Sequence, residues 1–97
     1  MAESKFETGE FVMTCGVSDK CSDDGFMQWA MGCLERHKQG DWGDLLSDDM
    51  KLNDRGLESG DGRLHSAYKH PDNTALQIWI VTEWNRSVTT ILLPEEY

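Results

Sequence analysis

The last third of the sequence carries side chains that could act on a phosphodiester bond. In metal-independent ribonucleases of the bacterial toxin kind, a histidine on a small antiparallel sheet moves the proton and an arginine stabilises the pentavalent phosphate. Arg63 and His65 alternate along a strand-like run and would point the same way. The candidate set for such an enzyme is His65, Tyr68, Arg86, Thr89 and Thr90. If instead the arginines pair with the abundant carboxylates and His65 is an ordinary sheet residue, the chain has no catalytic residue.

A second group of unusual residues lies in HKQGDWGDLLSDD, residues 37–49, which places a tryptophan between two glycines. Two interpretations stay open. Trp42 folds back to fix its own loop while the flanking aspartates face outward, or it anchors a partner, since tryptophan is frequent among binding hot spots. The residues predicted to bind a partner are Asp41, Trp42, Asp44, Asp48, Asp49 and Trp84.

Histidine and cysteine do not occur at the spacings that metal sites use. The chain has three of each, without a CxxC or HxxxH pair, and its aspartate-rich segments lack the alternation and final glutamate of a calcium loop. The sequence also lacks a glycine-rich phosphate loop and a nucleophile elbow. We therefore expect no metal, no cofactor and reduced thiols.

Net charge narrows the class of partner. Nine Lys and Arg against eighteen Asp and Glu give a formal charge of −9, which disfavours direct binding of nucleic acid and suits a basic protein surface. No apolar run reaches about 18 residues, so we expect no membrane-spanning segment. The first residues lack the pattern of a signal peptide. We expect a single cytoplasmic domain over residues 1–97, with residues 1–9 disordered.

Hydrophobic periodicity predicts two helices. The first covers about 23–39, with Ser22 as its N-cap and Gly40 as its C-terminal stop. Its apolar face consists of Phe26, Ala30, Cys33, Leu34 and His37. The second has Ser47 as its N-cap, carries two aspartates in its first turn and has only a thin apolar stripe, formed by Met50, Asn53 and Leu57.

Four β-branched or aromatic runs predict strands, over 11–15, 63–70, 75–83 and 87–93. Turn-forming segments, PDNT and WNR, separate the last three, which therefore form an antiparallel meander. Residues 17–25 are expected to form a loop. The predicted fold is α+β, with two helices packed on one face of a small antiparallel sheet made of the three-stranded C-terminal meander plus the short N-terminal strand.

The blocks ERHKQGDWGDL, GRLHSAY and WIVTEWNRSVTTILLPEEY, with Asn53 between the first two, resemble a family of small proteins encoded on phages and plasmids. The shared motifs have the form RHxxGDWG and WIxTExxRSxTTxLLPEEY, and the match covers residues 35–97. Members carry labels such as "plasmid-related protein" or "type I restriction endonuclease subunit M". The chain departs from the common pattern at Trp84-Asn85, where the family has Ala-Asp. The resemblance implies a mobile-element setting and no particular activity, and nothing here matches the cofactor loop of a methyltransferase.

These observations lead to one main hypothesis and two alternatives. The main hypothesis is a non-enzymatic acidic protein-binding module from a phage or plasmid that acts on a host protein. Its most specific form is an inhibitor of a nucleic-acid-handling or defence complex, similar in role to an anti-CRISPR or anti-restriction protein. The alternatives are a small ribonuclease-like enzyme on the C-terminal sheet, and a structural homo-oligomer formed through an open sheet edge or exposed tryptophans.

Overall fold

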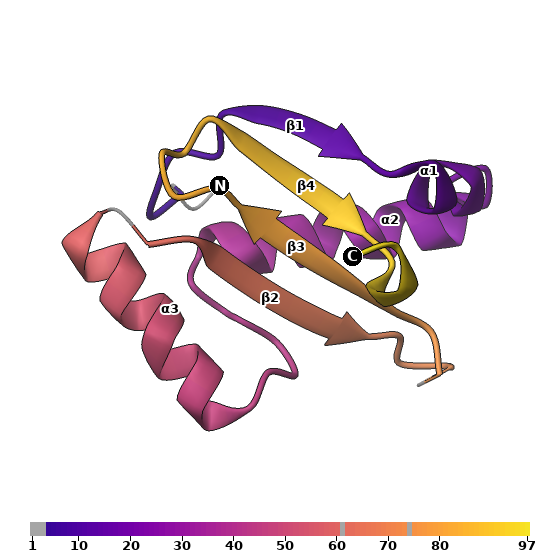
Figure 1. The fold of residues 1–97 in the computed structure, drawn as a ribbon. Coiled ribbons are helices and arrows are strands. Elements are labelled where there is room, and N and C mark those ends of the chain that lie inside the picture. The colour runs from indigo at the N-terminus through magenta and orange to yellow at the C-terminus, as the bar shows by residue number, and fades with distance from the viewer. Residues whose placement is uncertain (1–3, 61, 74) are drawn as a thin grey trace.

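The computed structural model describes residues 4–60, 62–73 and 75–97. Their strands form one four-stranded mixed sheet with the order β1-β4-β3-β2 (Figure 1). The strands are β1 (Glu10–Met13), β2 (Leu64–Lys69), β3 (Gln77–Thr82) and β4 (Val88–Leu92). The helices are α1 (Cys15–Lys20), α2 (Asp24–Lys38) and α3 (Ser47–Ser59), and the short 3-10 helix η1 covers Pro94–Glu96.

The α+β class, the C-terminal meander and the added N-terminal strand are confirmed. β2 pairs with β3 and β3 with β4 in antiparallel fashion, whereas β1 lies parallel to β4. The sheet is therefore mixed, and the expectation of a wholly antiparallel sheet is wrong for this strand. The parallel direction is fixed at the two ends of β1, where Glu10 N–H donates to the Ser87 carbonyl and Thr14 N–H donates to the Ile91 carbonyl.

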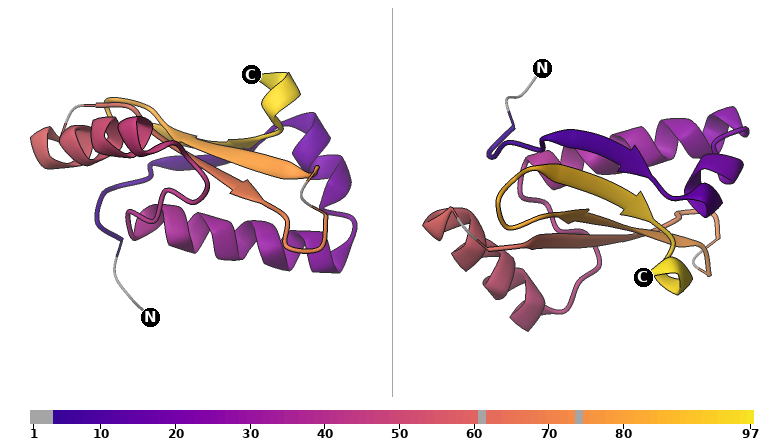
Figure 2. Two further views of the ribbon diagram at one scale, coloured as in Figure 1. Left: turned by 90° about the horizontal axis from the view of Figure 1, so that it is seen from below. Right: turned by 45° about the horizontal axis from the view of Figure 1, so that its top comes forward.

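The helices occupy different sides of the sheet. Figure 2 shows α2 lying across one face, α3 lying beside the β2 edge, and η1 standing on the other face. The helix α1 was not predicted, because residues 17–25 read as a loop. The residues at its N-terminus donate hydrogen bonds to a residue far away in the sequence. The Glu96 carboxylate accepts from the Thr14 hydroxyl at 2.5 Å and from Gly16 N–H at 3.0 Å.

Both long helices begin differently from the prediction. The N-cap of α2 is Asp23 rather than Ser22, and its carboxylate accepts from the backbone N–H groups of Gly25 and Phe26. Ser47 is the first residue of α3, after Leu46, and no side chain caps that helix. Carboxylates in the first turn, Asp24 in α2 and Asp48 in α3, are stabilised by the positive end of each helix dipole.

The core lies between α2 and the sheet, as periodicity predicted. The buried residues of α2 are the five expected ones, Phe26, Ala30, Cys33, Leu34 and His37. The four apolar ones pack on Ile78 and Ile80 of β3 and on Ile91 of β4, which are all fully buried. Burial of such aliphatic side chains contributes about 1.5–3 kcal/mol each and supplies most of the stability of this fold.

The N-terminal segment contacts the body of the protein. Residues 1–3, the first part of the segment expected to be disordered, lie outside the described residues. Lys5 N–H donates to the Lys38 carbonyl, and the Phe6 ring lies against His37 and Trp42. Within the described ranges, no helix is long and apolar enough to cross a membrane.

Candidate functional site

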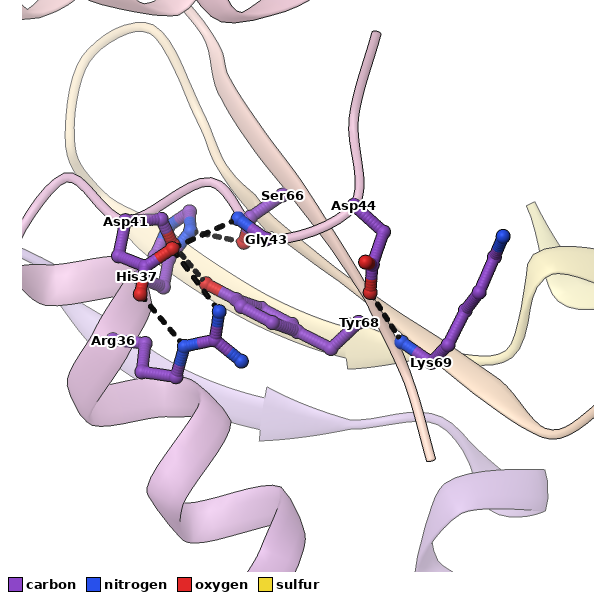
Figure 3. Close-up of polar contacts among 8 residues, drawn as sticks. All are labelled: Arg36, His37, Asp41, Gly43, Asp44, Ser66, Tyr68 and Lys69. Atoms are coloured by element: carbon purple, nitrogen blue, oxygen red, sulfur yellow. Dashed lines mark hydrogen bonds and ion pairs between the residues drawn. The ribbon is translucent and has the colours of Figure 1, made fainter. Parts of the chain in front are cut away.

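The GDWG loop closes the outer edge of β2. The bridge from Gly43 to Ala67 continues the sheet, with Ala67 N–H donating to the Trp42 carbonyl at 3.2 Å and Asp44 N–H donating to the Ala67 carbonyl at 2.7 Å. The Asp44 carboxylate accepts from the backbone N–H of Lys69 at 2.8 Å (Figure 3). A loop and a carboxylate therefore take the place of a fifth strand.

Gly43 is the residue that lets the loop come so close. Its φ is +73°, and a Cβ built there would lie 2.1 Å from the Ala67 carbonyl oxygen and 2.6 Å from the Tyr68 ring. Only glycine combines this backbone conformation with this contact distance. The second glycine of the motif is thus explained by packing on the sheet edge.

Asn53 of α3 closes the next part of the same edge. Its side-chain amide donates to the His65 carbonyl at 2.5 Å and accepts from the His65 N–H at 3.0 Å, as a neighbouring strand would. The outward-facing backbone groups of His65 and Ala67, together with the Lys69 N–H, therefore have partners. We call this set the closed edge.

The buried side chain of Trp42 holds the GDWG loop against the body of the protein. The side chain is only 4% exposed, lies against the rings of Phe6 and His37, and donates from Nε1 to the Asp54 carboxylate at 2.9 Å. The first of the two interpretations, that Trp42 fixes its own loop, agrees with this packing. A direct contact between a partner and an indole buried in this way would require the loop to open.

Arg36 and Tyr68 hold the start of the loop (Figure 3). Arg36 makes two hydrogen bonds to the Asp41 carboxylate, at 2.7 and 3.2 Å, and lies over the Tyr68 ring. The Tyr68 hydroxyl donates to the Asp41 carbonyl at 2.6 Å. The hydrogen bond from Arg36 lowers the pKa of Asp41. Because both charged side chains are half-exposed, solvent screening keeps the contribution of the pair to stability small.

A chain of hydrogen bonds runs through the protein beside this loop, with His37 at its centre. His37 Nδ1 lies 2.6 Å from the Ser66 hydroxyl and Nε2 lies 2.9 Å from that of Thr82, which is 2.7 Å from the Thr89 hydroxyl. Thr89 donates to the Thr8 carbonyl, so Thr82 must donate to Thr89 and accept from His37. This order places the imidazole proton on Nε2 and leaves Nδ1 to accept from Ser66.

His37 is suited to structure rather than to acid–base chemistry. The side chain is completely buried, and burial lowers its pKa to about 3. It is neutral at pH 7 and both ring nitrogens already have partners. No substrate could reach it without opening the core.

His65 lies on the opposite face of the sheet, in an aromatic cluster. Its ring contacts Trp79 at a centroid distance of 4.8 Å and stacks on Tyr97, whose hydroxyl accepts from Arg63. Burial, followed by the nearby Arg63 charge, lowers the pKa of His65. Among the described residues, His65 Nε2 is the buried side-chain nitrogen without a hydrogen-bond partner.

The residues of the ribonuclease prediction do not come together in one place. Thr89 faces the helix-covered side with His37, whereas Thr90 and His65 belong to the other face. Arg86, with φ of +60°, donates to the carbonyls of Gly56, Gly62, Glu83 and Trp84 and so fixes the β3–β4 turn. Tyr68 is buried and bonded to the loop.

The predicted partner-binding residues fall into two groups. Asp41, Trp42 and Asp44 make the internal contacts described above. Asp48 and Asp49 are exposed at the start of α3, and Trp84 is 62% exposed in the β3–β4 turn. Because Arg86 ties that turn to Gly56, near the end of α3, the structure does not bring Trp84 together with the two aspartates.

Sequence reasoning missed two exposed leucines. Leu46 is 76% exposed and Leu52 is 60% exposed, and they flank Asp48 and Asp49 within about two turns of α3. The signal was present, since Leu52 lies off the thin apolar stripe of this helix. We call Leu46, Asp48, Asp49 and Leu52 the α3 surface.

Among the described residues, no group of three or more His, Cys, Asp or Glu side chains could hold a metal ion. No family model, curated protein or solved structure matches the chain.

Proposed function

We propose that the chain is a non-enzymatic acidic module that binds a basic protein surface through the α3 surface. The observation that carries the proposal is the combination of two exposed leucines with carboxylates that no ion pair neutralises. Ion pairs among the described residues link Arg36 to Asp41 and Lys38 to Glu35. Neither Asp48 nor Asp49 takes part in one.

The chemistry of this surface favours a protein partner. Leucines provide apolar area that becomes buried on binding, and the surrounding carboxylates select a partner with lysine or arginine at the rim. The excess of nine negative charges accelerates association with such a partner and repels nucleic acid. The mobile-element setting implied by the sequence resemblance makes a host nucleic-acid-handling or defence protein, with its basic surface, the partner class that we propose.

Affinity capture tests the proposal. Tagged protein is incubated with nuclease-treated bacterial lysate, and bound proteins are eluted by raising the salt concentration and identified by mass spectrometry. We expect one stoichiometric basic protein that elutes with salt, because screening removes the attraction between exposed charges. Capture that is indifferent to salt would contradict the electrostatic part of the proposal.

Matched variants locate the surface. Asp48→Asn with Asp49→Asn changes the charge by the same amount as Asp19→Asn with Asp24→Asn, and Asp24 also lies in the first turn of a helix. We expect the first pair to weaken binding of the captured partner by about tenfold or more, and the second pair to change it little. Equal losses in both variants would show that only total charge matters. Leu52→Ala tests the apolar part in the same assay.

A further inference from the structure

The two edges of the sheet differ in whether their backbone groups have partners. At the closed edge, His65, Ala67 and Lys69 are bonded to a loop and to α3. At the other edge, the backbone N–H groups of Glu10 and Thr14 donate to carbonyls next to and within β4. Because backbone groups alternate in direction along a strand, the N–H and C=O groups of Phe11 and Met13 point outward, away from β4. Within the described residues, no hydrogen bond to the backbone of Phe11 or Met13 is found.

Side chains do not protect this second edge either. Phe11 is 38% exposed, and Val12 and Met13 are partly buried. The run Phe-Val-Met contains neither lysine nor proline, two residues that commonly keep an edge strand from pairing. The outward N–H and C=O groups of Phe11 and Met13, four backbone groups in all, and the exposed side chain of Phe11 are thus available to another strand, while Met13 packs partly on the core.

We propose that β1 pairs with β1 of a second copy in an antiparallel arrangement centred on Val12. In this register Phe11 lies opposite Met13 of the second copy, and each pair exchanges its N–H and C=O groups. Val12 lies opposite Val12 of the second copy in a non-hydrogen-bonded pair. The two sheets become one continuous sheet of eight strands, and all outward groups of Phe11 and Met13 are satisfied.

The same register avoids local repulsion. Glu10 lies opposite Thr14 of the second copy, so the two Glu10 carboxylates do not face each other. On one face the apolar pair of Phe11 and Met13 forms twice, and such cross-strand pairs contribute roughly 0.2–1 kcal/mol each. Because β1 is complementary to itself in this register, we propose a second copy of the chain, rather than another protein, as the partner of this edge.

Two features make the dimer weak. A pair of four-residue strands buries less than the roughly 1,200 Å² typical of stable interfaces. The two copies also each carry a formal charge of −9 and repel one another. Salt screens this repulsion, so dimerisation strengthens as salt is added, opposite to the salt effect expected for the basic partner of the proposed function.

Sedimentation equilibrium of the intact protein, from about 10 µM to about 1 mM, tests the pairing at low and high salt. We expect a monomer–dimer equilibrium that shifts toward dimer with both protein and salt concentration. Phe11→Pro with Met13→Pro removes only outward N–H groups and should abolish the dimer. Phe11→Val with Met13→Val keeps those groups and should retain it. A monomer under all conditions, or a dimer unchanged by the prolines, would overturn the proposal.

Disulfide formation tests the register and does not depend on the proline variants. In a chain with Cys15→Ser and Cys21→Ser, Val12→Cys places two thiols opposite each other across a non-hydrogen-bonded pair, where Cα atoms lie about 4.5 Å apart. We expect mild oxidation to give a covalent dimer. Phe11→Cys is the control, because its opposite residue is Met13. Equal cross-linking of both variants would contradict the register centred on Val12.

Discussion

The closed edge at β2 and the open edge at β1 show two uses of polar groups in one small sheet. At β2, Asn53 and the GDWG loop bond to outward-facing backbone groups, and their own side chains are buried or fixed as a result. Among the described residues, β1 itself is hydrogen-bonded on one side only, to β4. The GDWG loop and Asn53, the most distinctive residues of this sequence, therefore stabilise an edge of the sheet. For this reason we place the two proposed binding surfaces on α3 and β1.

Gly43→Ala should disrupt the closed edge and cause the largest loss in the free energy of unfolding among the substitutions considered. The new Cβ would meet the Ala67 carbonyl, and alanine is strained at positive φ, so we expect a loss of about 3–5 kcal/mol in the free energy of unfolding. Urea denaturation measures it.

Gly60→Ala is the matched control for this substitution. Gly60 also has positive φ, +80°, but a Cβ there would meet no atom within 4 Å. The control should cost only about 1 kcal/mol. Similar losses in both variants would mean that the loop does not press on β2 as described.

Acid should lower the free energy of unfolding of the protein through His37. The folded-state pKa of His37, about 3, is below its unfolded value near 6.5, so the unfolded chain binds a proton first as the pH falls. The contribution of neutral His37 is therefore present above pH 6.5 and is lost progressively down to about pH 3. We expect stability to fall by up to about 1.4 kcal/mol per pH unit below pH 6.5.

His65 adds to this slope in the same direction, because its pKa is also lowered. His37→Gln should lower stability at pH 7 by about 3 kcal/mol, since Ser66 and Thr82 lose their partner, and should remove most of the slope between pH 6.5 and 5. His65→Gln should leave most of the slope in place. If His65→Gln flattened the curve instead, the assignment of the slope to His37 would be wrong.

Asn53→Ala should open the closed edge locally. The His65 N–H and C=O lose both side-chain bonds, and we expect a loss of about 2 kcal/mol in the free energy of unfolding, measured by urea denaturation. A variant with wild-type stability would show that Asn53 is not needed to close the edge.

Sequence periodicity predicted the elements that obey a repeating pattern. The buried face of α2 and the alternation of Ile78 and Ile80 follow directly from hydrophobic spacing. The direction of β1 and the existence of α1 did not follow, because they depend on contacts with Ser87, Ile91 and Glu96, far away in the sequence. Local patterns carry no information about such partners.

The candidate site shows the same division. Trp42 was recognised as unusual and its packing in the loop was among the interpretations, since a tryptophan between glycines suggests a tight turn. The roles of Asn53 and Ser66 were not recognised, because a polar residue on an apolar stripe is equally compatible with exposure and with a buried hydrogen bond. Only the position of the partner decides between them.

Amide hydrogen exchange at low protein concentration tests the contrast between the two edges most directly. The account predicts slow exchange for the outward-facing amides of His65, Ala67 and Lys69, and fast exchange for those of Phe11 and Met13, in the monomer. Equal exchange at both edges, or protection of Phe11 and Met13 in the dilute monomer, would contradict it.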